Sequence, residues 1–172
     1  MPQELRPRYR IVLAKEDFKF SAAHFTLFPG GGAELLHGHN YRVRLELSGA
    51  ALDEEGLLVD LDVVKRAVRA FCRRLDSRTL VPTESSRLRW SRHDGGVEVR
   101  LDERLYRFPE ADTLLLAIAN TSIELLARML WQDLAPHLEG SGVDHLAVSV
   151  EETAGQLCWY EAPTSTAPAA ER

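Results

Sequence analysis

Three histidines in one short stretch have the residue type and spacing to bind a metal ion. His37 and His39 are two residues apart, so on an extended strand their imidazoles point to the same face. His24 ends the apolar segment FKFSAAH and could return across a hairpin as a third ligand. Three neutral nitrogens with one open coordination position are the ligand set of a catalytic zinc. The alternative is an ordinary polar loop, but the third histidine and the glycine-rich loop between the histidines favour Zn²⁺.

The composition predicts a soluble, cytoplasmic protein. The chain has 172 residues, of which 45% are hydrophobic and 27% charged, and this suits a single domain. A net charge of −5 gives no support for nucleic-acid binding. The two cysteines indicate a reducing compartment, and we expect neither a secretory signal nor a membrane-spanning segment. We expect a loose lead-in over residues 1–8, one domain over residues 9–161 and a disordered tail over residues 162–172.

Apolar periodicity in the first half of the chain predicts the elements that position the histidines. Residues 9–23 mix alternation with apolar runs and predict a long first strand, with a bulge near residues 15–17. Strict alternation predicts a half-buried strand over residues 40–50. Three- and four-residue spacing then predicts an amphipathic helix over residues 60–75, with Asp60 as its N-cap.

The second half contains an inserted hairpin, then a helix and two strands. A hairpin with a tight Asp-Gly turn is predicted over residues 88–101, and short extended segments follow over residues 105–108 and 114–119. The capping-box pattern TSIE at residues 121–124 predicts a second helix, and a last hairpin covers residues 145–161. The order is strand–strand–helix–helix–strand–strand (ββααββ) with a hairpin inserted between the helices. This predicts an α+β domain with both helices on one face of an antiparallel sheet.

Several segments together carry a family resemblance. FSAAH followed by HGHNY resembles the zinc signature of the 6-pyruvoyl- and 6-carboxy-tetrahydropterin synthase family. The similarity continues in the family's order through LVDLDVVK, LD, NTSIELLA and VSVEET, so it covers most of the chain. The resemblance implies the tunnelling fold, with a four-stranded antiparallel sheet whose edges pair between subunits, and a homohexamer built as a dimer of trimers. It also implies a pterin triphosphate substrate, 7,8-dihydroneopterin triphosphate, held by the zinc.

The resemblance also implies catalytic residues, and this chain departs from the pattern at two of them. The family's usual base is a cysteine four residues before HGH, where this chain has Ala33. Glu34 beside it is similar to family members in which a glutamate takes over and cleaves the side chain to 6-hydroxymethyl-dihydropterin. A carboxylate near zinc can act as a general base, although a solvated loop carboxylate is the alternative. The family's Asp-His pair keeps Asp76, but Ser77 replaces the histidine and cannot shuttle protons near neutral pH.

Substrate anchoring matches the family more closely. Glu152 and Thr153 match its Glu-Thr pair, in which the carboxylate accepts hydrogen bonds from the pterin amino group and ring N–H. Glu151 is the neighbouring alternative, but its side chain is expected on the other face of the strand. Ser122 falls where the family has a threonine that contacts the pterin.

Four other residues remain open alternatives. His93 or His145 could supply the missing acid or base, although a surface or strand-end histidine is the simpler interpretation. Arg42 and Arg44 could neutralise the triphosphate, but the solvated face of a strand would look the same.

The sequence therefore favours a zinc-dependent pterin lyase that acts on dihydroneopterin triphosphate. Within that class, cleavage of the side chain by Glu34 competes with the pyruvoyl and carboxy synthase reactions. A catalytically altered pterin- or metal-binding protein of the same fold is the alternative, consistent with Ala33 and Ser77. A structural oligomer with incidental histidines is a third hypothesis, and it predicts no stoichiometric metal.

Overall fold

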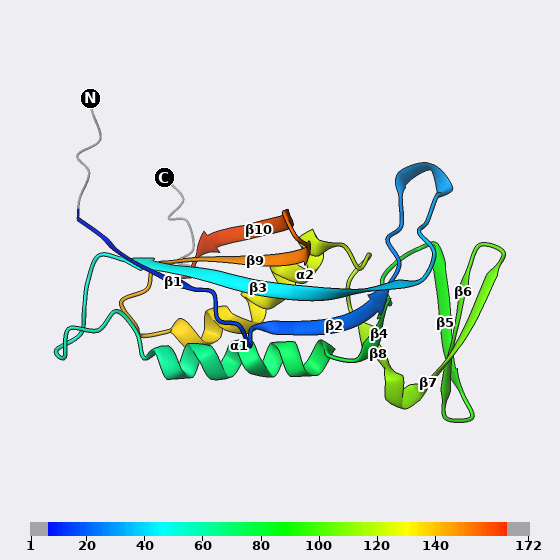
Figure 1. Ribbon diagram of the computed structural model, residues 1–172, viewed down its shortest axis with the longest axis horizontal. Helices are drawn as coiled ribbons and strands as arrows, with labels where there is room; N and C mark the ends of the chain where they lie inside the picture. Colours follow the sequence, from blue (N-terminus) through cyan, green and yellow to red (C-terminus); the bar gives the residue numbers. More distant parts are fainter. Residues whose placement is uncertain (1–6, 165–172) are drawn as a thin grey trace, which may run out of the picture.

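The chain folds around one large sheet, and the computed structural model describes residues 7–164. Within that range the main sheet has seven strands. β3 is its long central strand, with β1 and β2 end to end along one edge and β9 along the other (Figure 1). The antiparallel part of the sheet consists of five strands: β1 (Tyr9–Leu13), β2 (Lys19–His24), β3 (His37–Gly49), β9 (His145–Thr153) and β10 (Gln156–Pro163).

The predicted first strand is divided into β1 and β2. Its expected bulge is a turn, in which the Phe18 N–H donates to the Lys15 carbonyl at 3.1 Å. The two strands still share one edge of β3, because β1 pairs with its distal half and β2 with the half that begins at His37. β3 itself starts earlier than the predicted residue 40, so both His37 and His39 lie on a regular strand.

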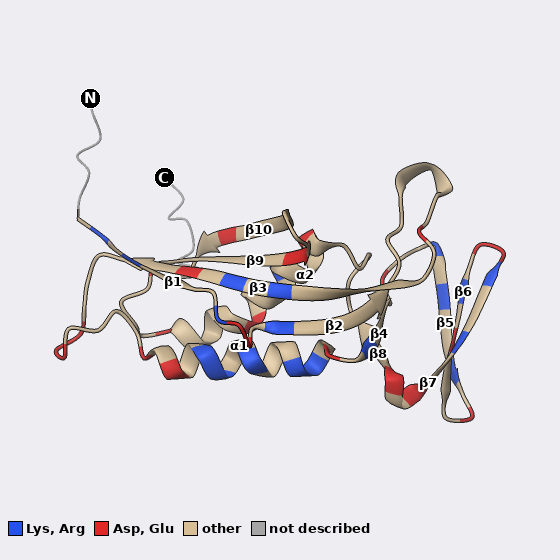
Figure 2. Cartoon of the chain, in the orientation of Figure 1, with Lys and Arg blue, Asp and Glu red and all other residues tan. Residues whose placement is uncertain are grey.

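One face of the sheet is buried under two helices, as predicted for an α+β domain. Alternate residues of β3 from Tyr41 to Leu47 are at most 1% exposed and belong to the main core. Phe20 of β2 stacks on Tyr41 with a ring-centroid distance of 4.7 Å. The helices α1 (Leu61–Leu75) and α2 (Ile123–Leu134) contribute their apolar faces to the same core. Lys and Arg residues lie along the other side of α1 (Figure 2).

The two helices begin differently. Asp60 is the N-cap of α1, as predicted, and its Oδ1 accepts from the Asp62 N–H at 2.8 Å. The predicted capping box of α2 does not form, because the N-cap is Ser122 and its side chain makes no capping hydrogen bond. Thr121 is fully buried, and its hydroxyl donates to the carbonyl of Phe25 at 2.9 Å instead. The start of α2 is therefore tied to the end of β2.

The sheet is larger than the predicted four strands and is not wholly antiparallel. β4 (Arg78–Pro82) pairs in parallel with β2, and β8 (Thr113–Leu116) pairs in parallel with β4. The alternation of apolar and polar residues did not predict β4. The strand has only five residues, and the consecutive residues Leu80 and Val81 are both fully buried, so its buried and exposed residues do not alternate. These strands cover the edge of β2 that a four-stranded sheet would leave open.

The insertion is a three-stranded sheet, in which the segment predicted at residues 105–108 adds a third strand to the predicted hairpin. Its strands are all antiparallel: β5 (Leu88–His93), β6 (Gly96–Leu101) and β7 (Arg104–Pro109). The predicted Asp-Gly turn joins β5 to β6, with positive φ at Asp94 (44°) and Gly95 (76°). This sheet stands beyond the end of β2 and encloses a second small core with Phe25 and Val81 of the main body (Figure 1).

In the described part of the chain, the remaining elements are three short 3-10 helices: η1 (Pro29–Gly31), η2 (Glu110–Asp112) and η3 (Ala135–Leu138). The predicted tail boundary after residue 161 is too early, because Ala162 and Pro163 continue β10 by pairing with Leu146 and His145. Residues 165–172 of that tail, and residues 1–6 of the lead-in, lie outside the described residues. The single domain over residues 9–161 stays a prediction. Among the described helices, none has the length and apolar character needed to cross a membrane.

Candidate metal and active site

The paired strands β2 and β3 bring the three predicted metal ligands together. His24, the last residue of β2, is directly opposite His37, and Ala22 is opposite His39. All three imidazoles lie on the sheet face that carries the core, and their candidate ligand atoms are within 4.8 Å of one another. Within the described part of the chain, no other group of His, Cys, Asp or Glu has this arrangement. The three histidines can therefore bind a metal ion.

Backbone carbonyls fix the orientation of two of the imidazoles. His24 Nδ1 lies 3.0 Å from the carbonyl oxygen of Thr121, and His37 Nδ1 lies 2.8 Å from that of Leu35. A carbonyl oxygen only accepts hydrogen bonds, so each Nδ1 must carry the proton. Each Nε2 then keeps its lone pair, as metal-ligating histidines with such partners do.

His24 Nε2 provides a direct test of whether a cation fits. The His24 side chain is completely buried, and no group among residues 7–164 makes a hydrogen bond to Nε2. Burial lowers the pKa of His24, despite the opposing effects of Thr121 and Glu152, so the imidazole is held neutral. Glu152 Oε1 is 3.0 Å away, without the alignment of a hydrogen bond. A buried lone pair facing a carboxylate oxygen is unfavourable by itself, and a cation between them would satisfy both.

Glu152, the predicted pterin anchor, lies within this cluster. Its Oε1 is also 3.6 Å from His39 Nε2, and it accepts from the Tyr41 hydroxyl at 3.3 Å. Its Oε2 accepts from the Gln156 amide at 3.0 Å. Burial, reinforced by Glu152, raises the pKa of Tyr41, so the phenol stays protonated and able to donate. The carboxylate is therefore oriented by side chains from both β3 and β10.

Glu34, the predicted base, lies on the loop between β2 and β3. One carboxylate oxygen accepts from the Thr26 N–H at 2.9 Å, and the Glu34 N–H donates to the Thr26 carbonyl at 3.0 Å. Partial burial acts to raise the pKa of Glu34, but the hydrogen bond from the Thr26 N–H, with a smaller electrostatic effect of the nearby His37 and His24 imidazoles, outweighs it. The net pKa is lowered, so the carboxylate is ionised near neutral pH and interacts electrostatically with the histidine cluster.

Asp76 and Ser77 lie beside β2, and Ser77 lines a pocket together with Ser21 and His39. Asp76 Oδ1 accepts from the backbone N–H of Ser21 at 2.7 Å, at the edge of β2. Ser77 has a positive φ of 59°, and its hydroxyl lies 3.4 Å from Asp76 Oδ2. None of the contacts described for these two residues involves a histidine of the cluster. A catalytic role for Asp76 stays a prediction.

The other two predicted substrate contacts flank the site. Ser122 follows Thr121, whose carbonyl orients His24, and it begins α2. Thr153 is exposed at the end of β9, and its hydroxyl donates to Gln156 Oε1 at 3.4 Å. Thr153 thereby contacts the same glutamine that donates to Glu152.

The four open alternatives point away from the cluster. Arg42 and Arg44 alternate with the buried residues of β3, so their side chains project on the opposite face. Arg44 pairs there with Glu151 at 2.5 Å, which confirms that Glu151 faces the other side. His93 contacts the Ser91 hydroxyl at 2.8 Å in the inserted sheet, and His145 lies 3.8 Å from Glu161 at the far end of β9.

Five supporting residues were not predicted from the sequence as parts of the site: Thr26, Leu35, Tyr41, Thr121 and Gln156. Thr26, Leu35 and Thr121 contact the site through backbone groups, which every residue type carries, so their residue types could not indicate this role. Tyr41 matched the core pattern of its strand. Gln156 could have been found from its place in the hairpin after Glu152.

Comparison with known proteins assigns the chain to a family. The family description "6-pyruvoyl tetrahydropterin synthase" matches residues 13–163, which is most of the chain. The chain belongs to the 6-pyruvoyl tetrahydropterin synthase family. It is accordingly a lyase of the 6-pyruvoyl/6-carboxy-tetrahydropterin synthase type, and the predicted α+β tunnelling fold is confirmed.

Individual members of the 6-pyruvoyl tetrahydropterin synthase family are similar over different shares of the chain. A Methanocaldococcus jannaschii protein, provisionally named a 6-carboxy-5,6,7,8-tetrahydropterin synthase, is 27% identical over 145 residues, which cover 83% of this chain and 88% of its own. The Bacillus subtilis 6-carboxy-5,6,7,8-tetrahydropterin synthase is 41% identical over 68 residues, 39% of this chain and 45% of its own.

Solved structures extend the likeness to nearly the whole fold. The Plasmodium falciparum 6-pyruvoyl tetrahydropterin synthase superposes with a TM-score of 0.84 at 25% identity, covering 91% of this chain and 98% of its own. A Plasmodium vivax 6-pyruvoyltetrahydropterin synthase in which a catalytic glutamate is replaced by alanine gives a TM-score of 0.82 at 26% identity, covering 91% of this chain and 99% of its own.

Proposed function

We propose that this chain is a zinc-dependent lyase that acts on the side chain of 7,8-dihydroneopterin triphosphate, with Glu34 as its general base. The observation that carries the proposal is the ionised Glu34 carboxylate, held by Thr26 beside a histidine cluster in which the buried His24 Nε2 has no hydrogen-bond partner. The Plasmodium vivax relative, whose catalytic residue is a glutamate, supports a carboxylate base.

His24, His37 and His39 would hold the zinc. Three nitrogen donors from the protein leave a coordination position for substrate, which is the pattern of catalytic rather than structural zinc. A zinc ion bound there would supply Lewis-acid polarisation of a substrate oxygen. The carbonyls of Thr121 and Leu35 would keep the His24 and His37 rings aimed at it.

Glu152 would anchor the pterin ring. A carboxylate has two acceptor oxygens, which match the adjacent amino and ring N–H donors of a pterin edge. Tyr41 and Gln156 already hold Glu152 in place, so little side-chain entropy would be lost on binding. Ser122 and Thr153, on either side of the site, are the further contacts that we propose.

Glu34 would remove the proton from the second hydroxyl of the side chain. The O–H electrons then form a C=O bond as the bond to the ring-attached carbon breaks. The displaced pair passes to the ring-attached carbon, which takes up a proton and becomes the 6-hydroxymethyl group. The other product is a two-carbon aldehyde that carries the triphosphate. An ionised carboxylate with a lowered pKa is in the correct protonation state for the first step at neutral pH.

Product analysis by mass spectrometry tests the proposal. The zinc-loaded protein is incubated with 7,8-dihydroneopterin triphosphate, and we expect 6-hydroxymethyl-7,8-dihydropterin. A 6-pyruvoyl or 6-carboxy product would be consistent with a lyase. It would contradict cleavage to the 6-hydroxymethyl product and the step assigned to Glu34. Unchanged substrate, with stoichiometric zinc and pterin bound, would contradict the proposed enzymatic activity. The chain would then be interpreted as a pterin-binding protein. Glu54→Gln, on an exposed carboxylate distant in sequence, is the matched control for side-chain changes.

The homohexamer stays a prediction that sedimentation can test. We expect a particle of six times the chain mass of 19.3 kDa. A monomer with full activity would contradict the assembly without affecting the assignment of the histidine cluster.

A further inference from the structure

The inserted sheet reaches back to the loop that carries Glu34. Arg104, the first residue of β7, donates from Nη1 to the Glu34 carbonyl at 2.6 Å and from Nη2 to the Ala33 carbonyl at 3.3 Å. These two carbonyls lie on either side of the Glu34 α-carbon. A planar guanidinium that holds both restricts the backbone torsions of Glu34 and hence the direction of its side chain.

A second arginine of the insertion holds the rest of the same loop. Arg87, just before β5, donates to the carbonyls of Phe28 at 3.1 Å, Gly31 at 2.6 Å and Gly32 at 3.0 Å. Its guanidinium is itself fixed by Asp102 at 2.7 Å, in the turn between β6 and β7. Arg87 and Arg104 therefore bind the carbonyls of five residues between Phe28 and Glu34.

This loop needs outside support to hold a base in place. It contains three consecutive glycines, two of which, Gly30 and Gly31, have positive φ of 81° and 105°, and among the described residues nothing lies within 4 Å of the position that a Cβ would take at either one. Glycine loses more conformational freedom on ordering than any other residue. The loop's own backbone contributes the Phe28–Gly32 hydrogen bond, the Leu27–Ala33 bridge and the Glu34–Thr26 hydrogen bond.

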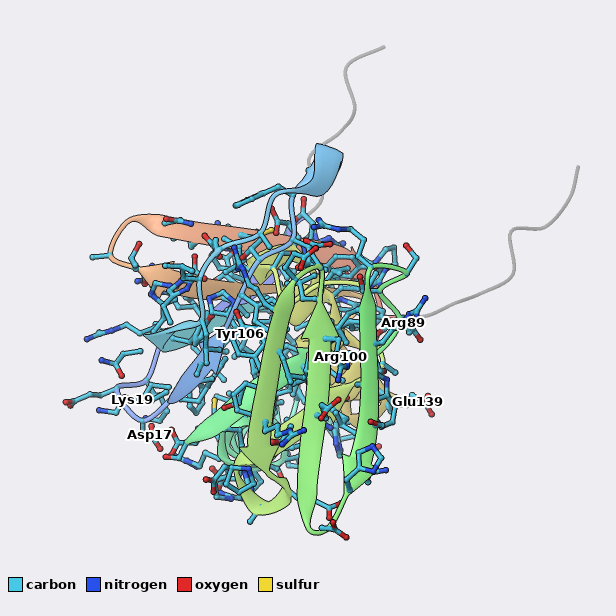
Figure 3. The ribbon with its side chains drawn as sticks, turned by 90° about the vertical axis from the view of Figure 1, so that its right-hand side faces the viewer. Asp17, Lys19, Arg89, Arg100, Tyr106 and Glu139 are labelled. Atoms are coloured by element: carbon cyan, nitrogen blue, oxygen red, sulfur yellow. The ribbon has the colours of Figure 1, made fainter. Side chains whose placement is uncertain are left out.

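The inserted sheet is anchored firmly enough to supply that support. Its inner face packs on Phe25, the residue after the metal ligand His24, and Tyr106 stacks on Phe25 with ring centroids 5.8 Å apart. Its outer face carries exposed charged side chains such as Arg89 and Arg100 (Figure 3). Arg104 is on the inner side, and Arg107 of the same strand is on the outer side, paired with Glu98 at 3.0 Å.

We propose that the inserted sheet is the positioning element for the base of this enzyme, with Arg104 and Arg87 as the positioning residues that hold Glu34 toward the histidine cluster. This inference rests on the proposed function, in which Glu34 acts as the base. Displacement of a catalytic group by about 1 Å can cost on the order of 100-fold in rate, so control of the loop becomes control of turnover.

Arg104→Ala tests the proposal, with Arg107→Ala as the matched control on the same strand. We expect Arg104→Ala to lower kcat by roughly 10- to 100-fold while KM and zinc content stay within about twofold, because Glu152 and the histidines hold the substrate. Arg104→Lys should recover part of the loss, since an ammonium can still donate to one carbonyl but lacks the two-pronged geometry. Arg107→Ala should behave as wild type.

The same substitution in the Glu34→Gln background separates positioning from general structural damage. If Arg104 acts through Glu34, then Arg104→Ala should lower kcat little further once the base is already removed. If the fall in kcat of the double variant equals the product of the falls in Arg104→Ala and Glu34→Gln, the two residues act independently and the proposal is overturned. A fall in kcat accompanied by an equal loss of zinc would overturn it too, because the arginine would then support the metal site.

Hydrogen exchange keeps the proposal testable even if the proposed function fails. If the wild-type protein leaves dihydroneopterin triphosphate unchanged, the function is wrong, yet the loop amides of Phe28 and Glu34 can still be measured. We expect them to exchange at least about tenfold faster in Arg104→Ala and in Arg87→Ala than in Arg107→Ala. Equal exchange in all three variants would overturn the positioning role.

Discussion

The two halves of the candidate site are supported in different ways. The histidines lie on β2 and β3, where a continuous backbone ladder sets His24 opposite His37. Glu34 lies on a glycine-rich loop, and side chains from other elements hold its backbone carbonyls. A strand pair needs no outside contact to keep ligands in register, whereas a loop residue is only as well placed as its tertiary contacts make it. Metal binding should therefore be robust, and base placement fragile.

The largest expected effect is the loss of His37, one of the three proposed metal ligands. His37→Ala should abolish stoichiometric zinc binding and lower turnover by more than the roughly 10- to 100-fold that changes around a metal site cause. Zinc content by elemental analysis, together with kcat, checks this. His93→Ala in the inserted sheet is the control and should retain full zinc. Normal zinc in His37→Ala would show that the strand-borne cluster is not the metal site.

The second-largest effect is expected for Glu34→Gln, which tests the proposed base without changing the proposed metal ligands. Glu34→Gln keeps the size of the side chain and an oxygen that can accept from the Thr26 N–H, so the loop should stay in place. Turnover should fall by about 10²- to 10⁴-fold, the usual contribution of a general base, with zinc and pterin binding unchanged. Single-turnover kinetics and equilibrium binding measure the two separately. A change of less than about threefold would remove Glu34 from the chemistry.

A smaller effect is expected at Asn120, which contacts both the loop that carries Glu34 and the segment that orients His24. Its amide group bonds the backbone N–H and C=O of Leu27, each at 3.0 Å, and its Oδ1 also accepts from the Thr121 N–H at 3.0 Å. Asn120→Ala should lower the free energy of unfolding by about 1–3 kcal/mol, because these backbone groups lose a partner. Chemical denaturation measures this loss.

The activity of Asn120→Ala sharpens the comparison. If the two regions are supported separately, kcat should fall several-fold while zinc content is unchanged. Loss of zinc would show that Thr121, which orients His24, and the Glu34 loop depend on one shared support. Asn120→Asp is the companion variant, because it keeps the Oδ1 acceptor but replaces the donor to the Leu27 carbonyl with a negatively charged oxygen.

The smallest effect is expected at Tyr41. Tyr41→Phe removes the 3.3 Å hydrogen bond to Glu152 and leaves the stacking on Phe20 intact. Loss of about 0.5–1.5 kcal/mol should weaken pterin binding by roughly 2- to 10-fold, with kcat nearly unchanged. Titration calorimetry with a pterin ligand checks this. A larger effect on zinc than on pterin would show that the hydroxyl serves the metal site instead.

Much of the fold could be predicted from local patterns. Asp60 as an N-cap, the Asp-Gly turn at residues 94–95 and the alternating strand around Tyr41 are all specified by near neighbours in sequence. The strand β4 was missed because it has only five residues, and the parallel pairing of β4 with β2 and β8 was missed because these partners are distant along the chain; β8 itself overlaps the extended segment predicted at residues 114–119. The predicted capping box does not form because the Thr121 hydroxyl, buried beside β2, donates to the Phe25 carbonyl instead.

The sequence by itself determined the histidine cluster and the carboxylates near it. His37 and His39 share a face because strand side chains alternate, and this holds wherever the strand lies. Only the tertiary structure decided how Glu34 is held. Arg104 is 70 residues away in sequence, and its partners are backbone carbonyls, which every residue carries. A contact of that kind leaves no trace in residue type or spacing, because folding alone brings the two segments together.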